Sequence, residues 1–102
     1  MHAGVDLVCS EVSGNFCATL YERADCGGWA LNVGSGYTEL PREKKNEAET
    51  VVLKAGCNMI GYDKPVGWQG ARSTKFEAAD GLVWKLKSNQ LRHGIEAVSC
   101  YC

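Results

Sequence analysis

Short runs of β-forming residues, in which apolar and polar positions alternate or apolar positions follow one another, recur along this chain. The runs occupy residues 16–21, 30–33, 50–53, 58–62, 83–87 and 95–101. Turns containing glycine separate several of them, at 34–36, 55–56 and 79–81. Segment 42–49 (REKKNEAE) has helical propensity, but it is long enough only for a helical turn or a solvated loop. Many short strands joined by turns predict an all-β antiparallel sandwich or barrel.

One sequence pattern occurs twice, with its copies about 40 residues apart, a period that indicates an internal repeat. In each copy a tyrosine precedes a charged turn, which leads to a bulky or sulfur-containing residue, one spacer residue and a glycine. The matched positions are Tyr21, Cys26 and Gly28 in the first copy and Tyr62, Trp68 and Gly70 in the second. A folded-over hairpin explains the pattern, because glycine takes a positive φ or admits close backbone approach at low cost. The first aromatic can then cover the folded corner.

The repeat also divides the chain. Residues 49–53 match residues 96–100, so the two similar halves are 16–56 and 57–102. At 102 residues the chain has the length of one domain. We therefore expect a single domain over 16–102, preceded by an extension, 1–15, that Cys9 ties down.

Six cysteines in a short chain indicate disulfide bonds and an oxidising compartment. They are Cys9, Cys17, Cys26, Cys57, Cys100 and Cys102. Six cysteines allow 15 connectivities, and the sequence alone does not choose among them. A zinc site needs paired C-x-x-C or Cys/His spacings. The chain has only a C-x-C sequence at its end, so we expect disulfides and no metal site.

The repeated pattern resembles the Greek-key signature of the βγ-crystallin superfamily: aromatic, four residues, aromatic, any residue, glycine. Tyr21 and Gly28 match in the first copy, where Cys26 replaces the second aromatic. Tyr62, Trp68 and Gly70 match in the second copy, which has one extra residue in its spacer. The resemblance implies a sandwich of two Greek-key motifs, in which each motif donates a strand to the other's sheet.

A narrower resemblance is to syncollin-like secreted proteins. It rests on the Cys-Gly-Gly turn at 26–28, on segments 17–23 and 51–57, and on the final strand ending in Cys-x-Cys at 95–102. In the implied sandwich the strand from Cys57 neighbours the final strand, which suggests a Cys57–Cys100 bridge. The resemblance also implies a non-enzymatic protein of the secretory-granule lumen, associated with membranes and with itself.

Net charge, the lengths of the apolar runs and the first residues of the chain exclude some classes of function. The net charge is −1, so a nucleic-acid partner is not expected. No apolar run has the length of a membrane span. The first residues lack a signal peptide's apolar core, so we expect a mature secreted chain from which the signal peptide has been removed.

Many βγ-crystallin domains bind calcium through the sequence N/D-N/D-x-x-S/T-S. Here the two aligned segments are 45–50 (KNEAET) and 92–97 (RHGIEA), in which a cation takes the first position and glutamate replaces the serine. Asn46, Glu49 and Glu96 remain as weak ligand candidates. Calcium needs several oxygen ligands, so we expect calcium binding to be lost and no other cofactor to be bound.

No catalytic set is recognisable. The two histidines are His2, near the terminus, and His93, in a loop after Arg92. A nucleophile needs a base within reach, and bridged cysteines supply no thiolate. We therefore expect no enzyme activity and no catalytic residue.

Three tryptophans are candidates for a binding stripe or for core positions. Trp68 belongs to the hairpin motif and is expected to be structural. Trp84 alternates with Leu86 and should face inward, which leaves Lys85 and Lys87 on the other face. Trp29 could lie on either face, so it stays a weak surface candidate. Lys44 and Lys45 are similar candidates for acidic partners, although neighbouring glutamates dilute their charge.

The function that follows is a secreted, disulfide-stapled binding module whose partner is a lipid membrane, a glycan or a second copy of itself. Two alternatives stay open. Small disulfide-rich βγ-like domains also occur among antimicrobial and toxin-type defence proteins, and a stable fold of this kind also suits a structural matrix protein.

Overall fold

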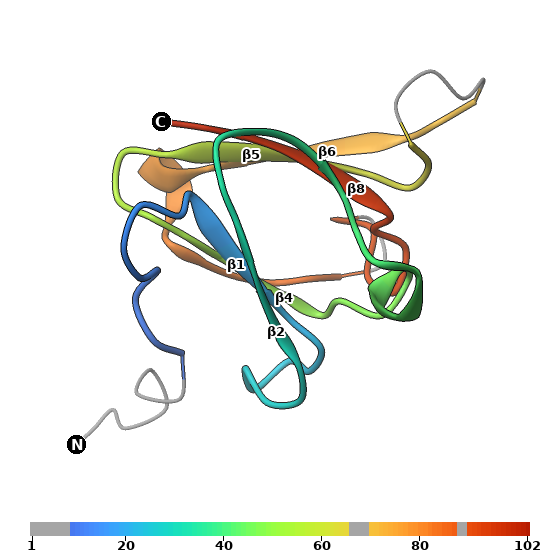
Figure 1. Cartoon of the computed structure of the whole chain (residues 1–102), viewed down its shortest axis with the longest axis horizontal. Helices are drawn as coiled ribbons and strands as arrows, with labels where there is room; N and C mark the ends of the chain where they lie inside the picture. The colour runs from blue at the N-terminus through green and yellow to red at the C-terminus, as the bar shows by residue number, and fades with distance from the viewer. Residues whose placement is uncertain (1–8, 66–69, 88–89) are drawn as a thin grey trace.

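The computed structural model describes residues 9–65, 70–87 and 90–102, whose strands form two four-stranded antiparallel sheets. The strands are β1 (Ala18–Tyr21), β2 (Ala30–Val33), β3 (Gly36–Glu39), β4 (Thr50–Leu53), β5 (Asn58–Tyr62), β6 (Ser73–Glu77), β7 (Val83–Lys85) and β8 (Ala97–Tyr101). Two short 3-10 turns, η2 (Arg42–Lys44) and η3 (Ala78–Asp80), complete the elements. Figure 1 shows the two layers, with β5, β6 and β8 on one side and β1, β2 and β4 on the other. The predicted all-β class is confirmed.

The two halves exchange their third strands. The first sheet has the order β2-β1-β4-β7 and the second has the order β3-β8-β5-β6. Strand β7 of the second half thus pairs with β4, with Val51 opposite Trp84, and β3 of the first half pairs with β8, with Thr38 opposite Val98. This exchange is the arrangement that the βγ-crystallin resemblance implies.

The core lies between the sheets and is built from alternate residues of the strands. Its largest fully buried side chains include Leu20, Val51 and Leu53 from the first sheet and Met59, Phe76 and Val98 from the second. The Trp84 ring packs edge-on against Phe76, with 5.3 Å between ring centroids, so the expected inward orientation of Trp84 is confirmed. Removing these apolar surfaces from water is the main force that holds the layers together.

Two strands, β3 and β6, were not predicted from the sequence. Gly36 begins β3, although the glycines at 34–36 predict a turn, and β6 (STKFE) buries only Phe76. Both are edge strands with polar outer faces, so backbone pairing with a neighbour rather than an apolar pattern keeps them extended. The helical turn expected in 42–49 is present as η2.

Three disulfides fasten the sandwich. They join Cys9 to Cys26, Cys17 to Cys100 and Cys57 to Cys102. The first ties the N-terminal segment to the turn between β1 and β2. The second crosses the core, because Cys17 precedes β1 in one sheet and Cys100 lies on β8 in the other. The third joins the residue before β5 to the C-terminal residue.

The expected Cys57–Cys100 bridge is wrong, although the strand after Cys57 does neighbour the final strand as expected. The register of β5 against β8 places Asn58 opposite Tyr101. In an antiparallel pair the next positions outward are Cys57 and Cys102, and these two are bonded. The side chain of Cys100 points instead into the core, where it is 1% exposed.

A salt bridge closes the hairpin between β5 and β6. Arg72 donates its backbone N–H to Asp63 Oδ1 at 2.6 Å and its side-chain Nε–H to Oδ2 at 3.1 Å, and Asp63 donates its own N–H to the Arg72 carbonyl. The backbone hydrogen bond is the main reason that the pKa of Asp63 lies below its usual value.

We first predict unequal losses of stability when the disulfides are removed in pairs. Replacing Cys17 and Cys100 by alanine should cost about 4–5 kcal/mol in the free energy of unfolding, and replacing Cys9 and Cys26 about 3 kcal/mol, in the loop-entropy model. The reason is that the first bridge closes a sequence separation of 83 residues and the second only 17. Urea denaturation of both double variants measures the difference. An equal or reversed order of the two losses would contradict the role assigned to the inter-sheet bridge.

We also predict that Asp63 supports stability at neutral pH but not in acid. Its pKa in the folded state is lowered, so its contribution is present above the pKa of the unfolded chain and is lost as the pH falls through the folded value. Asp63→Asn should therefore destabilise the protein at about pH 7 and have little effect at about pH 2. Thermal unfolding at several pH values, with the exposed Asp80→Asn as control, tests this. A constant effect of Asp63→Asn across that range would exclude the linkage.

Candidate functional site

The loops that precede β4 and β8 cross each other and repeat one geometry. Asn46 donates its backbone N–H to the Ile95 carbonyl at 2.9 Å, and His93 donates its own to the Ala48 carbonyl at 3.2 Å. Both donors have a left-handed backbone, with φ of 64° at Asn46 and 57° at His93. Each is the second residue of its aligned six-residue segment, so the internal repeat places equivalent residues on either side of the crossing.

Side chains at the crossing also pair between the two segments. The Asn46 amide donates to Glu96 Oε2 at 2.9 Å, and His93 Nε2 lies 2.7 Å from Glu49 Oε2. Arg92 adds a cation, with Nη2 3.5 Å from the same Glu49 oxygen. The second residue of each segment thus meets the fifth residue of the other segment. The structure therefore places all three weak calcium candidates at the crossing, but in two separate pairs.

Both carboxylate oxygens of Glu49 bind groups of the protein itself. Its other carboxylate oxygen, Oε1, accepts the backbone N–H of Ala24 at 3.1 Å, so both oxygens are bonded. Its backbone N–H donates to the Tyr21 carbonyl at 3.0 Å, as that of Glu96 does to the Tyr62 carbonyl at 2.8 Å. A calcium ion would have to displace a cation or an N–H group from this carboxylate, which costs those contacts.

Lys45 and Lys44 also have partners in the folded chain. Lys45 Nζ lies 2.7 Å from Glu39 Oε2, and this hydrogen bond is the main reason that the pKa of Lys45 is raised. Lys44 Nζ lies 5.7 Å from the centre of the Trp29 ring, within the range of a cation–π contact. Trp29 packs against the core, and its backbone N–H donates a hydrogen bond to Glu22 Oε1 at 3.2 Å. The structure brings Trp29 and Lys44 together, but as a contact within the protein.

The hairpin motif has the expected local geometry at its first copy. Gly28 has φ of 77°, and a Cβ there would overlap the side chain of Glu22. Tyr21 packs against the small buried cluster of Val12, Cys26 and Val52, so it lies over the folded corner. In the second copy Gly70 has φ of 79°, and Trp68 lies outside the described residues.

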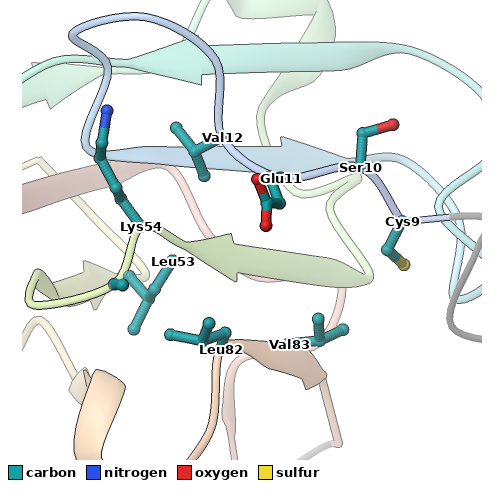
Figure 2. Close-up of a pocket in the computed structure, with 9 residues that line it drawn as sticks. Cys9, Ser10, Glu11, Val12, Leu53, Lys54, Leu82 and Val83 are labelled. Carbon is teal, nitrogen blue, oxygen red and sulfur yellow. The ribbon is translucent and has the colours of Figure 1, made fainter.

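A hollow of about 280 Å³ lies between the N-terminal segment and the edge strand β7. Figure 2 shows Val12 and Glu11 on one side of it and Leu53, Leu82 and Val83 on the other. We call this hollow the apolar groove, with Val12, Leu53, Leu82 and Val83 as its apolar lining. Leu82 and Val83 are 42% and 45% exposed, although leucine and valine side chains are usually buried.

The groove exists because two segments share the outer face of β4. Val52 faces outward on β4, and the N-terminal segment covers it with Val12. On its other side Val52 pairs with Val83, which that segment leaves exposed. The sequence analysis did not identify this surface, because its lining comes from three separate segments. The adjacent apolar residues Leu82 and Val83 were the only local signal.

Lysines border the apolar groove. Lys85 follows Val83 by two positions in β7, so both point to the outer face of the sheet, where both are exposed. Lys54 donates its ammonium to the Gly14 carbonyl, and Figure 2 shows that ammonium directed away from the hollow. The result is an exposed apolar surface with the Lys85 cation near its β7 side and the exposed carboxylate of Glu11 on its N-terminal side.

The described residues show little that suggests catalysis. All six cysteines are disulfide-bonded, so a thiol nucleophile is absent. His93 is paired with Glu49, and His2 lies outside the described residues. Within 9–65, 70–87 and 90–102 no helix could span a membrane.

The fold matches solved βγ-crystallin domains, while the chain matches no protein-family model and no curated protein sequence. A domain from Flavobacterium johnsoniae superposes with a TM-score of 0.68 at 14% identity, covering 84% of this chain and 94% of that one. A domain from Clostridium beijerinckii gives 0.60 at 13%, covering 83% and 97%. The Ca²⁺-bound domain of Abundant Perithecial Protein from Neurospora crassa gives 0.63 at 11%, covering 89% and 93%. The chain thus has the βγ-crystallin fold.

We predict that calcium does not stabilise this protein. Millimolar Ca²⁺ should leave the midpoint of thermal unfolding unchanged relative to Mg²⁺ at equal ionic strength, because Arg92, His93 and the backbone N–H of Ala24 already bind the Glu49 carboxylate. Calorimetry with each ion measures this.

A matched variant sharpens the calcium test. Arg92→Asp with His93→Asn removes the guanidinium and the imidazole from Glu49 and adds oxygen ligands, at two side chains that are about half exposed. We expect this variant to gain stability with Ca²⁺. Stabilisation of the unmodified protein at micromolar Ca²⁺ would show that the crossing binds the ion despite its internal pairs.

Proposed function

We propose that this protein is a secreted, non-enzymatic binding module that associates with lipid membranes through the apolar groove. The observation that carries the proposal is the exposure of Leu82 and Val83 beside a hollow of about 280 Å³. Exposed apolar side chains on a rigid edge strand can enter the boundary between lipid headgroups and acyl chains. Lys85 beside them would favour anionic headgroups.

The oxidised cysteines support a location outside the reducing cytosol. Three disulfides persist where the surroundings are oxidising, as in the secretory pathway and outside the cell. They also give a small domain the stability to keep apolar residues on its surface without unfolding. We therefore propose secretion or storage in a secretory-granule lumen as the setting in which the groove meets a membrane.

We propose that the module folds and binds membranes without a metal ion. The reason is that Glu49 and Glu96 are already bonded to Arg92, His93 and Asn46 within the protein. The module would therefore bind membranes equally with and without calcium. Non-enzymatic action agrees with the βγ-crystallin fold and with the absence of a free thiol.

Vesicle co-sedimentation with the oxidised protein tests the proposal. We expect binding to vesicles of phosphatidylcholine with phosphatidylserine, and weaker binding to phosphatidylcholine alone, because of Lys85. Leu82→Ser with Val83→Thr should weaken binding at least about tenfold, which is about 1.4 kcal/mol. Tyr101→Ser is the matched control, since Tyr101 is 42% exposed on the other sheet.

Two results of this experiment would contradict the proposal. Equal binding by the groove variant and the control variant would remove the apolar groove as the contact. No binding of the unmodified protein to either vesicle would overturn the membrane proposal. Glycan arrays and sedimentation velocity would then test the glycan and self-association alternatives, and growth inhibition of bacteria and fungi would test a defence role. Concentration-dependent assembly would favour a matrix protein.

A further inference from the structure

Four cysteines gather at one end of the sandwich. The sulfur atoms of Cys17, Cys57 and Cys102 all lie within 4.8 Å of one another. Cys100 joins them, because its sulfur is bonded to that of Cys17. Two disulfides that close separations of 83 and 45 residues therefore meet side by side. These four residues are called the cysteine cluster below.

Backbone hydrogen bonds, as well as the disulfides, hold the cluster together. Lys54 donates its N–H to the Cys17 carbonyl at 3.0 Å, and Cys57 donates its own to the Lys54 carbonyl at 3.0 Å. These bonds fix the turn between β4 and β5 against the start of β1. On the other side, the pairing of β5 with β8 brings the C-terminal residues beside Cys57. The four sulfur atoms would therefore stay close if the disulfides were opened.

We propose that the cysteine cluster, once reduced, is a tetrathiolate site for Zn²⁺. Zinc binds cysteine sulfur at about 2.3 Å in a tetrahedron, which places the sulfur atoms about 3.8 Å apart. The sulfur atoms of Cys17, Cys57 and Cys102 already lie within 4.8 Å of one another, and that of Cys100 is bonded to that of Cys17, so side-chain rotations can bring all four to that spacing. The site joins the C-x-C sequence at the chain end to two cysteines that are distant in sequence.

The chemistry of the interconversion balances. Each disulfide takes two electrons and two protons from a dithiol, which becomes a disulfide, and yields two thiols. A trialkylphosphine gives only the two electrons and becomes a phosphine oxide, while water supplies the two protons and the oxygen. Zinc then binds four thiolates, and four protons are released to solvent. In the reverse direction two molecules of a small disulfide accept the four electrons and, with four protons from solvent, become thiols, which re-forms both bridges and expels the metal. In either state the same four residues fasten β8 to the starts of β1 and β5.

The exposure pattern provides an entry route. Cys17, Cys57 and Cys100 are at most 2% exposed, whereas Cys102 is open to solvent. A reductant can therefore reach the Cys57–Cys102 bridge first, and a metal ion can enter from the same side. The three buried sulfur atoms would then supply three ligands from the core and Cys102 the fourth, which gives the four protein ligands of a structural zinc site.

The test uses the full chain reduced with tris(2-carboxyethyl)phosphine under argon. We expect one Zn²⁺ per chain in competition with a chromophoric chelator, and Co²⁺ should give the intense visible bands of a tetrahedral tetrathiolate. Cys57→Ser and Cys102→Ser should each weaken zinc binding at least about tenfold, since each removes a ligand. Cys9→Ser with Cys26→Ser is the matched control, because these two cysteines pack in the separate cluster around Val12 and Val52.

Circular dichroism of the same samples shows whether the reduced chain is folded or unfolded when zinc is added. If the reduced chain stays folded, zinc should raise its unfolding temperature; if it unfolds, zinc should restore its β-sheet signal. A reduced chain that binds no zinc, or that stays unfolded with it, overturns the proposal. So does equal zinc affinity in the Cys57→Ser variant, which would indicate binding by any reduced cysteines of the chain.

Discussion

The pairing of β4 with β7 and of β3 with β8 is the constraint on which the rest of this structure depends. Because each third strand joins the opposite sheet, neither half can complete a sheet alone. The exchange also forces the loops before β4 and β8 to cross, which brings Glu49 to His93 and Asn46 to Glu96. The polar crossing is thus a consequence of the topology rather than a separate feature.

At the crossing, the two halves of the chain have the same backbone hydrogen bonds but different side-chain pairs. Equivalent backbone bonds join Asn46 to Ile95 and His93 to Ala48, whereas the side-chain pairs differ in charge. One pair joins an amide to a carboxylate, and the other joins an imidazole and a guanidinium to a carboxylate. A half-exposed pair of this kind contributes only about 1 kcal/mol. Its main effect is to leave each carboxylate with a partner inside the protein.

The N-terminal segment and the cysteines shape the remaining surface. The bridge from Cys9 to Cys26 holds that segment over the outer face of β4, which buries Val52 and leaves the apolar groove beside Val83. At the ends of β4 and β8 that lie away from the crossing, the cysteine cluster adds covalent links to the packing of the core. A domain of this size gains much of its stability from such links, because its core is small.

Six of the eight strands in the described residues, the internal repeat and the use of disulfides could be predicted from the sequence alone. The alternating residues of Ala30–Val33 and the continuous apolar run in Thr50–Leu53 form the predicted strands, because side-chain period and β-propensity are local properties. Tertiary contacts were needed to fix the edge strands β3 and β6, the partner of Cys57, and the residues that share the apolar groove and the cysteine cluster. These depend on strand register and on contacts between segments far apart in the chain, such as Cys17 with Cys100 and Val12 with Val52. No local pattern specifies such contacts, because the same residues could satisfy several registers until packing of the two sheets selects one.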